Sequence, residues 1–159
     1  MLLIVFIYNA TSYICTNMET KIDYVYNTAF VLENETKVSK WLAQAAMKEG
    51  FSVGEVVYAF FNDEDLKSLN NKHLNHDYFT DVISFNDSKS TVLNGNIAIS
   101  IDRVRENAER YKATFNDELL RVMVHGLLHF MGYDDSSDKE TLLMRDKEDD
   151  NLKMFHVEQ

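Results

Sequence analysis

The segment from residue 117 to residue 135 constrains the fold most, because it joins a long apolar helical pattern to two histidines and a glycine stop. His125 and His129 are four positions apart, so both lie on one face of an α-helix and can reach a single metal ion. Gly132 follows the last expected turn, where a glycine readily takes the left-handed conformation that reverses the chain. We therefore expect a buried metal-binding helix, with Asp135 as the third ligand.

Two histidines at this spacing are a weak signal by themselves, because satisfied core or surface histidines are more common than metal ligands. Burying this apolar helix, however, buries both imidazoles, and each ring then needs partners for both nitrogens. A metal ion on one nitrogen and a hydrogen-bond acceptor on the other meets that need. Asp134 is the competing third ligand.

The expected donor set is two histidines and one carboxylate, which is a known catalytic zinc set whose fourth position is open to water. A carboxylate ligand also makes harder ions more competitive. We therefore expect one zinc ion, with manganese or another divalent ion as the alternative.

Zinc peptidases also place two histidines four apart on a helix, and in them a glutamate beside the first histidine activates water. This chain has Gly126 at that position, so the peptidase base is missing. Ordinary proteolysis is not expected.

Three ordered motifs resemble those of the YbeY endoribonuclease family. HGLLHFMGYDD at 125–135 is similar to the family signature H-G-x-L-H-x-x-G-Y-D-H, LNNKHLNHDYFTDVISF at 69–85 resembles its Leu-Asn opening and T-D-V-L-S-F strand, and NGNIAIS at 94–100 resembles its L-G-D-I-x-I-S stretch. The resemblance implies a metal-dependent endonuclease specific for single-stranded RNA. It further implies a role in ribosomal RNA maturation, namely 16S rRNA 3′-end processing, and in ribosome quality control, with RNA and the ribosome or a ribosomal protein as partners rather than DNA or a membrane.

Two positions depart from the family pattern. Asp135 stands where the family has a third histidine, and Leu74 stands where many members carry an arginine thought to serve catalysis or RNA contact. His76 or Arg103 is a hypothetical source of the missing positive group, and His76→Ala should then lower RNA cleavage without changing metal binding.

The simplest mechanism is attack on the phosphodiester by a metal-bound water, with the ion also polarising a phosphate oxygen. The sequence identifies no general base. Thr80, Asp81 and Ser84 are candidates to line the cleft, although ending a strand and bonding within a loop is their more common role.

Length and composition fit one domain, since the 159 residues include no proline and only five glycines and no linker divides them. We expect that domain to span residues 18–159. Residues 1–17 begin with eight apolar residues but lack the positive n-region of a secretory signal and the about 20 apolar residues of a spanning helix. We therefore expect a non-functional start extension, initiation at Met18, and a cytoplasmic protein, consistent with the single Cys15.

Apolar periodicity predicts strands alternating with helices. The expected fold class is α+β, with a small mixed four-stranded sheet packed against helices and a zincin-like metal helix. The strands are expected at 22–26, 55–61, 81–85 and 96–100, and the helices at 38–50, from 62 or 63 through 69, at 102–112, from about 117, and at 138–153.

The net charge of −10 opposes RNA binding at first sight, since phosphate contacts normally come from lysine and arginine. Arg103 and Arg110 share a helical face, which is either an RNA contact or a solvated surface. Three function classes stay open: the endoribonuclease, a ribosome-associated binding factor with a structural metal, and an atypical metal hydrolase or peptidase.

Overall fold

Four strands form one mixed sheet in a computed structural model that describes residues 21–74 and 77–157. The strands are β1 (Lys21–Tyr26), β2 (Ser52–Phe61), β3 (Val82–Asn86) and β4 (Val92–Ser100). Their order in the sheet is β1-β2-β4-β3. The first three strands in this order are parallel, whereas β3 runs antiparallel to β4 and forms an edge. This edge strand lies beside the candidate site.

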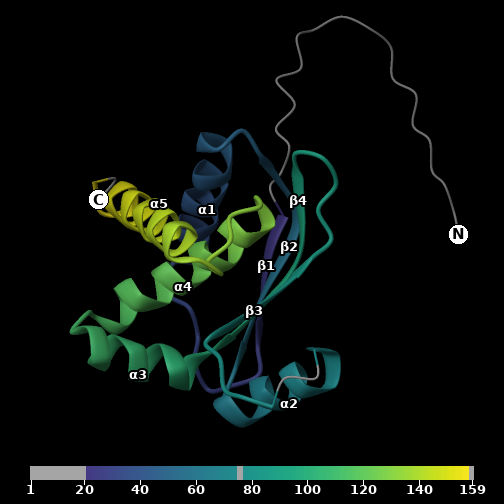
Figure 1. The fold of residues 1–159 in the computed structure, drawn as a ribbon, viewed down its shortest axis with the longest axis vertical. Helices are drawn as coiled ribbons and strands as arrows, with labels where there is room; N and C mark the ends of the chain where they lie inside the picture. The colour runs from purple at the N-terminus through teal and green to yellow at the C-terminus, as the bar shows by residue number, and fades with distance from the viewer. Residues whose placement is uncertain (1–20, 75–76, 158–159) are drawn as a thin grey trace, which may run out of the picture.

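Five helices in the described ranges complete the fold (Figure 1). They are α1 (Glu35–Lys48), α2 (Asp63–Leu74), α3 (Ile101–Tyr111), α4 (Phe115–Phe130) and α5 (Asp138–Val157). Figure 1 shows α1, α4 and α5 together on one side of the sheet, and α2 near the opposite end of the molecule. The metal helix predicted from sequence is α4, and it lies between the sheet and α5.

Strand alternation divides the apolar residues between two cores. Successive side chains of a strand point to opposite faces, so Ile97 and Ile99 of β4 join the main core with α1, α4 and α5. Ala98 instead packs with Leu66 of α2 and Ile83 of β3 in a smaller core. The predicted α+β class and mixed four-stranded sheet are therefore confirmed.

Some boundaries differ from the prediction for local reasons. β4 begins at Val92 rather than 96, because its first residues continue the ladder with β2 although Asn94 and Gly95 interrupt the apolar pattern. α1 begins at Glu35, three residues early. α2 begins as predicted, with Asn62 Oδ1 accepting a hydrogen bond from the Asp65 backbone N–H at 2.9 Å, but it runs on to Leu74.

The expectations for residues 1–17 and for initiation at Met18 concern a segment outside the described residues, so they stay predictions. Among the helices that the structure describes, none has the length and apolar character to cross a bilayer.

Candidate metal centre

Helix α4 carries the candidate ligands, and its two ends are fixed by local interactions. Thr114 caps the first turn by accepting a hydrogen bond from the Asp117 backbone N–H at 3.0 Å. At the other end Gly132 has φ +91°, and its N–H donates to the carbonyl of His129 at 3.1 Å. The predicted reversal at Gly132 is thus confirmed, and the chain turns back towards the histidine face.

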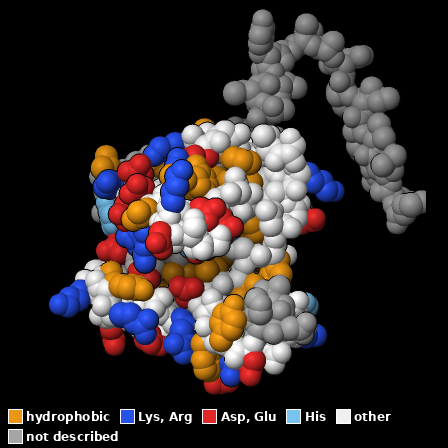
Figure 2. Space-filling view, in the orientation of Figure 1, with side chains coloured by type: hydrophobic (Ala, Val, Ile, Leu, Met, Phe, Trp, Pro, Cys, Tyr) orange, Lys and Arg blue, Asp and Glu red, His pale blue; other side chains and the backbone are white. Residues whose placement is uncertain are grey.

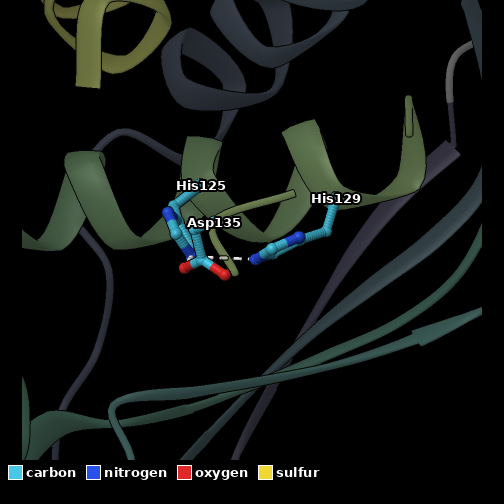
Figure 3. A group of neighbouring side chains, drawn as sticks. All are labelled: His125, His129 and Asp135. Carbon is cyan, nitrogen blue, oxygen red and sulfur yellow. Dashed lines mark hydrogen bonds and ion pairs between the residues drawn. The ribbon is translucent and has the colours of Figure 1, made fainter. Parts of the chain in front are cut away.

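Three side chains converge beside α4 on the side that faces the sheet (Figure 3). The Nε2 atoms of His125 and His129 lie 3.0 Å apart, and Asp135 Oδ2 lies 3.6 Å from His125 Nε2. One potential ligand atom from each of the three residues lies within 4.8 Å of the others. The Asp134 side chain instead bonds to the backbone of the next residue, where its Oδ1 accepts from the Asp135 N–H at 2.8 Å. The geometry thus favours Asp135, although its role as a ligand stays a prediction.

The other ring nitrogen of each histidine already has an acceptor. His129 Nδ1 lies 2.9 Å from the Tyr133 carbonyl oxygen, and His125 Nδ1 lies 2.7 Å from Glu148 Oε1. A carbonyl and a carboxylate only accept, so both Nδ1 atoms carry hydrogen. In the neutral rings the two Nε2 atoms then present lone pairs towards each other across 3.0 Å.

Facing lone pairs repel, and a proton or a metal ion between the two nitrogens would remove this repulsion. A divalent ion would use both nitrogens and a carboxylate oxygen of Asp135, which is a zinc-type donor set. Metal-binding histidines normally have such an acceptor on the ring nitrogen that does not bind the ion. The residues present therefore fit a divalent ion.

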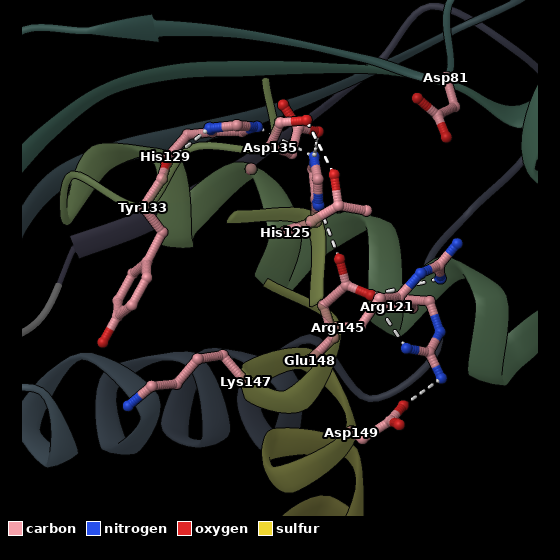
Figure 4. Close-up of polar contacts among 12 residues, drawn as sticks. Asp81, Arg121, His125, His129, Tyr133, Asp135, Arg145, Lys147, Glu148 and Asp149 are labelled. Atoms are coloured by element: carbon pink, nitrogen blue, oxygen red, sulfur yellow. Dashed lines mark hydrogen bonds and ion pairs between the residues drawn. The ribbon is translucent and has the colours of Figure 1, made fainter. Parts of the chain in front are cut away.

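The sequence analysis missed Glu148 on α5, which contacts the candidate ligand His125. Its side chain is almost fully buried, and its Oε2 accepts from Arg121 at 2.9 Å and from Arg145 at 3.5 Å (Figure 4). Burial raises the pKa of the Glu148 carboxyl, but hydrogen bonds from His125 and Arg121 outweigh that effect and the net pKa is lowered. For the His125 imidazole, burial lowers the pKa, but the hydrogen bond to Glu148 and the charges of Glu148 and Asp135 outweigh burial, and the net pKa is raised.

A second network holds the turn between the ligands. The Tyr133 hydroxyl donates to Glu49 Oε2 at 2.5 Å, and Lys147 Nζ lies 2.7 Å from Glu49 Oε1. These contacts join α1, the turn and α5. Because the Tyr133 carbonyl also accepts from His129, this network holds both the turn and the ring of one candidate ligand.

Two hollows open beside the candidate ligands. The larger, of about 580 Å³, is lined by both histidines, Asp135, the edge strand β3 and the loop before it. The smaller, of about 210 Å³, lies between α3, α4 and α5 and includes the Glu148 network. Thr80, Asp81 and Ser84 all line the larger hollow, as the sequence suggested, and Asp81 also lines the smaller one.

These three residues also make hydrogen bonds that hold the local structure together, which is the more common role given above. Thr80 Oγ1 donates to the Val82 carbonyl at 3.2 Å, Asp81 accepts from Asn107 at 3.0 Å, and Ser84 donates to the Gly126 carbonyl at 3.3 Å. They therefore form the wall of the hollow and at the same time hold it together.

Arg103 lies away from the candidate ligands in a network of its own. Its Nε and Nη2 each lie 2.8 Å from Asp63 Oδ2, and Nη1 lies 2.7 Å from Glu106. Arg110 binds the same Glu106 at 2.9 Å, so the predicted shared face of the two arginines is confirmed. Among the described residues, Arg103 is not in the lining of either hollow. Its hypothetical RNA role stays a prediction, and His76 lies outside the described residues.

Gly126 allows α4 to lie close to the sheet. A Cβ atom at this position would lie 2.7 Å from Cγ2 of Ile97 and 3.3 Å from Oγ of Ser84. A larger side chain here would therefore push the helix away from β4. Close packing against Ile97 thus explains why no glutamate stands next to His125, and the chain lacks the base of a zinc peptidase as a result.

Comparison with known proteins identifies the family. The family model "Endoribonuclease YbeY" matches residues 19–156. The chain belongs to the YbeY endoribonuclease family. A YbeY endoribonuclease of Flavobacterium psychrophilum is 48% identical over 138 residues, covering 87% of this chain and 99% of that protein. A YbeY endoribonuclease of Flavobacterium johnsoniae is 44% identical with the same coverage.

A solved structure shares the fold of this chain. The solution structure of a Thermotoga maritima protein resembles this chain with a TM-score of 0.62 and 28% identity, covering 86% of this chain and 90% of that one. The resemblance predicted from the three motifs is thus confirmed.

Proposed function

We propose that this protein is a metal-dependent endoribonuclease that cuts single-stranded RNA during ribosomal RNA maturation, including 16S rRNA 3′-end processing and ribosome quality control. Membership of the YbeY family supports the reaction class. The observation that carries the metal dependence is the convergence of His125, His129 and Asp135 at the wall of an open hollow.

The residues of the chain have distinct tasks in this proposal. His125, His129 and Asp135 hold one divalent ion, which we expect to be zinc, with manganese as the alternative. Such an ion supplies Lewis-acid activation of water and of the phosphodiester. Glu148 and the Tyr133 carbonyl fix the orientation of the two rings, so that both Nε2 atoms are available to the ion.

The larger hollow is the place where we expect the RNA strand to lie. Its volume of about 580 Å³ falls in the range of about 300–1,000 Å³ common for ligand sites. Binding there would put a phosphodiester next to the three ligand side chains.

The charge distribution favours help from a partner. The net charge is −10, and Figure 2 shows acidic and basic side chains mixed on the visible face rather than one broad basic surface. Affinity for isolated RNA should therefore be modest, and binding to the ribosome or a ribosomal protein would raise the local RNA concentration. This role agrees with a cytoplasmic location.

The two other function classes are less well supported. A purely structural zinc usually has four protein ligands, whereas the described group supplies three beside an open hollow. An atypical peptidase would need a different base, because Gly126 offers none and cannot be enlarged without a clash with Ile97.

The test is to measure metal content and cleavage of a single-stranded RNA for the tag-free wild type, His129→Ala and His156→Ala. His156 binds Asp117 and is absent from the candidate ligand group, so His156→Ala is the matched control. We expect His129→Ala to lose both metal and cleavage and the control to keep both. Wild-type cleavage by metal-free His129→Ala would contradict the proposal.

A further inference from the structure

The loop before β3 places two consecutive aromatic residues in different surroundings. The Phe79 ring has two cationic groups close to it, with Lys67 Nζ 4.8 Å and the Arg103 guanidinium 4.7 Å from its centroid. Tyr78 is 56% exposed and lines the larger hollow together with His125, His129 and Asp135. Phe79 thus packs against cationic side chains of two helices, while Tyr78 contributes to the wall of the hollow beside the candidate metal centre and keeps more than half of its surface exposed.

Buried Asn70 on α2 fixes the backbone at this point. Its side chain is only 2% exposed, and its Nδ2 donates to the Tyr78 carbonyl oxygen at 3.1 Å. This hydrogen bond and the contacts of Phe79 therefore hold the backbone of Tyr78 at the wall of the hollow.

The composition of the hollow limits how it can hold RNA. Within the described part of the chain its lining includes no lysine or arginine, whereas Asp81 and Asp135 contribute negative charge. Ion pairs to phosphates are thus not available along this wall, apart from the ion itself. Attraction for a nucleotide along this wall can instead come from hydrogen bonds to neutral polar groups such as those of Thr80 and Asn86, and from stacking of its base on an aromatic ring.

We infer that Tyr78 forms a stacking subsite for the nucleobase next to the scissile phosphate. This inference rests on the proposed function, and it deepens that function by naming a residue that selects single-stranded substrate. A base in a duplex is stacked on its neighbours and cannot also lie against a protein ring, so a stacking subsite favours RNA whose bases are unpaired. Stacking is tolerant of sequence, because every base has an aromatic face.

The test compares the full-length, zinc-loaded wild type with Tyr78→Leu and Tyr78→Phe. Leucine keeps apolar bulk but removes the ring, and phenylalanine keeps the ring and serves as the matched control. The substrates are an unstructured oligoribonucleotide with one cleavage site and the same strand with abasic nucleotides on both sides of that site. We expect Tyr78→Leu to lower kcat/KM on the intact strand by about tenfold or more, mainly through KM, and Tyr78→Phe to stay near wild type.

The abasic strand separates stacking from a general disturbance of the loop. If Tyr78 stacks on a base, wild type and Tyr78→Leu should cleave the abasic strand at nearly equal rates. An equal loss on both strands, or no loss on the intact strand, would overturn the subsite.

A binding measurement keeps this test separate from that of the proposed function. Single-stranded RNA with 2-aminopurine at the position beside the cleavage site should lose fluorescence on stacking with the wild type and with Tyr78→Phe, but not with Tyr78→Leu. Absence of cleavage by the wild type would refute the proposed nuclease and leave the fluorescence result to decide the subsite. Equal quenching by all three proteins would overturn the subsite even if the nuclease is active.

Discussion

Glu148 Oε1 lies 2.7 Å from Nδ1 of His125, so a carboxylate on α5 orients a candidate metal ligand on α4. The same carboxylate is bound by Arg121 at 2.9 Å, which holds it in place. Helix α5 therefore takes part in the candidate site through contact with a candidate ligand, and we expect its packing on α4 to affect metal binding.

Glu148→Gln should weaken zinc affinity by about tenfold to 100-fold, the usual effect of removing a carboxylate partner from a ligand histidine. Glutamine keeps an acceptor oxygen of similar shape but loses the charge that favours the donor tautomer of His125. Competition with a chelator of known affinity measures the change. Asp149→Asn is the control, because Asp149 binds Arg121 at 2.7 Å and does not touch His125 in the described contacts. Equal affinities for wild type and Glu148→Gln would contradict the assigned role.

Asp135→Ala should lower the amount of zinc bound per chain, and Asp134→Ala should leave it near the wild-type value. The reason is geometric, since a carboxylate oxygen of Asp135 lies within 4.8 Å of the ligand nitrogens whereas Asp134 accepts from the backbone of the turn. Metal analysis after dialysis gives the answer. Full zinc retention by Asp135→Ala together with loss in Asp134→Ala would reverse the two roles.

Gly126→Ala should lower the free energy of unfolding by about 1–2 kcal/mol, because the new methyl group would lie 2.7 Å from Ile97 Cγ2. The expected loss is net of the about 1 kcal/mol by which alanine favours a helix over glycine. Urea denaturation of the metal-free protein measures it, and Gly126→Glu should be more destabilising still. An unchanged or higher stability of Gly126→Ala would show that α4 can shift away from the sheet without cost.

Glu49→Gln should cost about 1–3 kcal/mol of stability at pH 7, because it removes a charged partner of Lys147 and an acceptor of the Tyr133 hydroxyl. Burial raises the pKa of the Glu49 carboxyl, but Lys147 and Tyr133 outweigh it and the folded-state pKa lies below the usual value of 4.5.

A lowered pKa means that this contribution is present above the pKa of the unfolded chain and is lost as the pH falls through the folded-state value. The difference in stability between wild type and Glu49→Gln should therefore shrink below about pH 4.5. Urea denaturation at neutral and acidic pH measures both values. A difference that grows on acidification would contradict the ion-pair account.

Much of the site is predictable from sequence because its main parts are local. The spacing of His125 and His129, the apolar run around them and the stop at Gly132 lie within one helix and one turn, where short-range geometry decides which groups meet. The three motifs also lead to the correct family, which the match over residues 19–156 confirms.

The contacts that support the ligands are not predictable in this way. Glu148 is 23 residues from His125, and Glu49 is 84 residues from Tyr133, so both contacts depend on how α1 and α5 pack on the rest of the fold. Nothing in the local pattern of α5 distinguishes Glu148 from its acidic neighbours. For Arg103 the sequence suggests a guanidinium that is available to RNA. In the structure this guanidinium binds Asp63 of α2, and local sequence does not predict that contact either.

The most direct test of the account is a zinc titration of the metal-free protein in which RNA cleavage is followed at each step. Cleavage of single-stranded RNA should rise in proportion to bound zinc and level off at one ion per chain for the wild type, while His129→Ala should stay inactive throughout. Cleavage that is already complete without bound metal, or zinc that binds stoichiometrically without producing any cleavage, would contradict the claim that this site makes the protein a metal-dependent endoribonuclease.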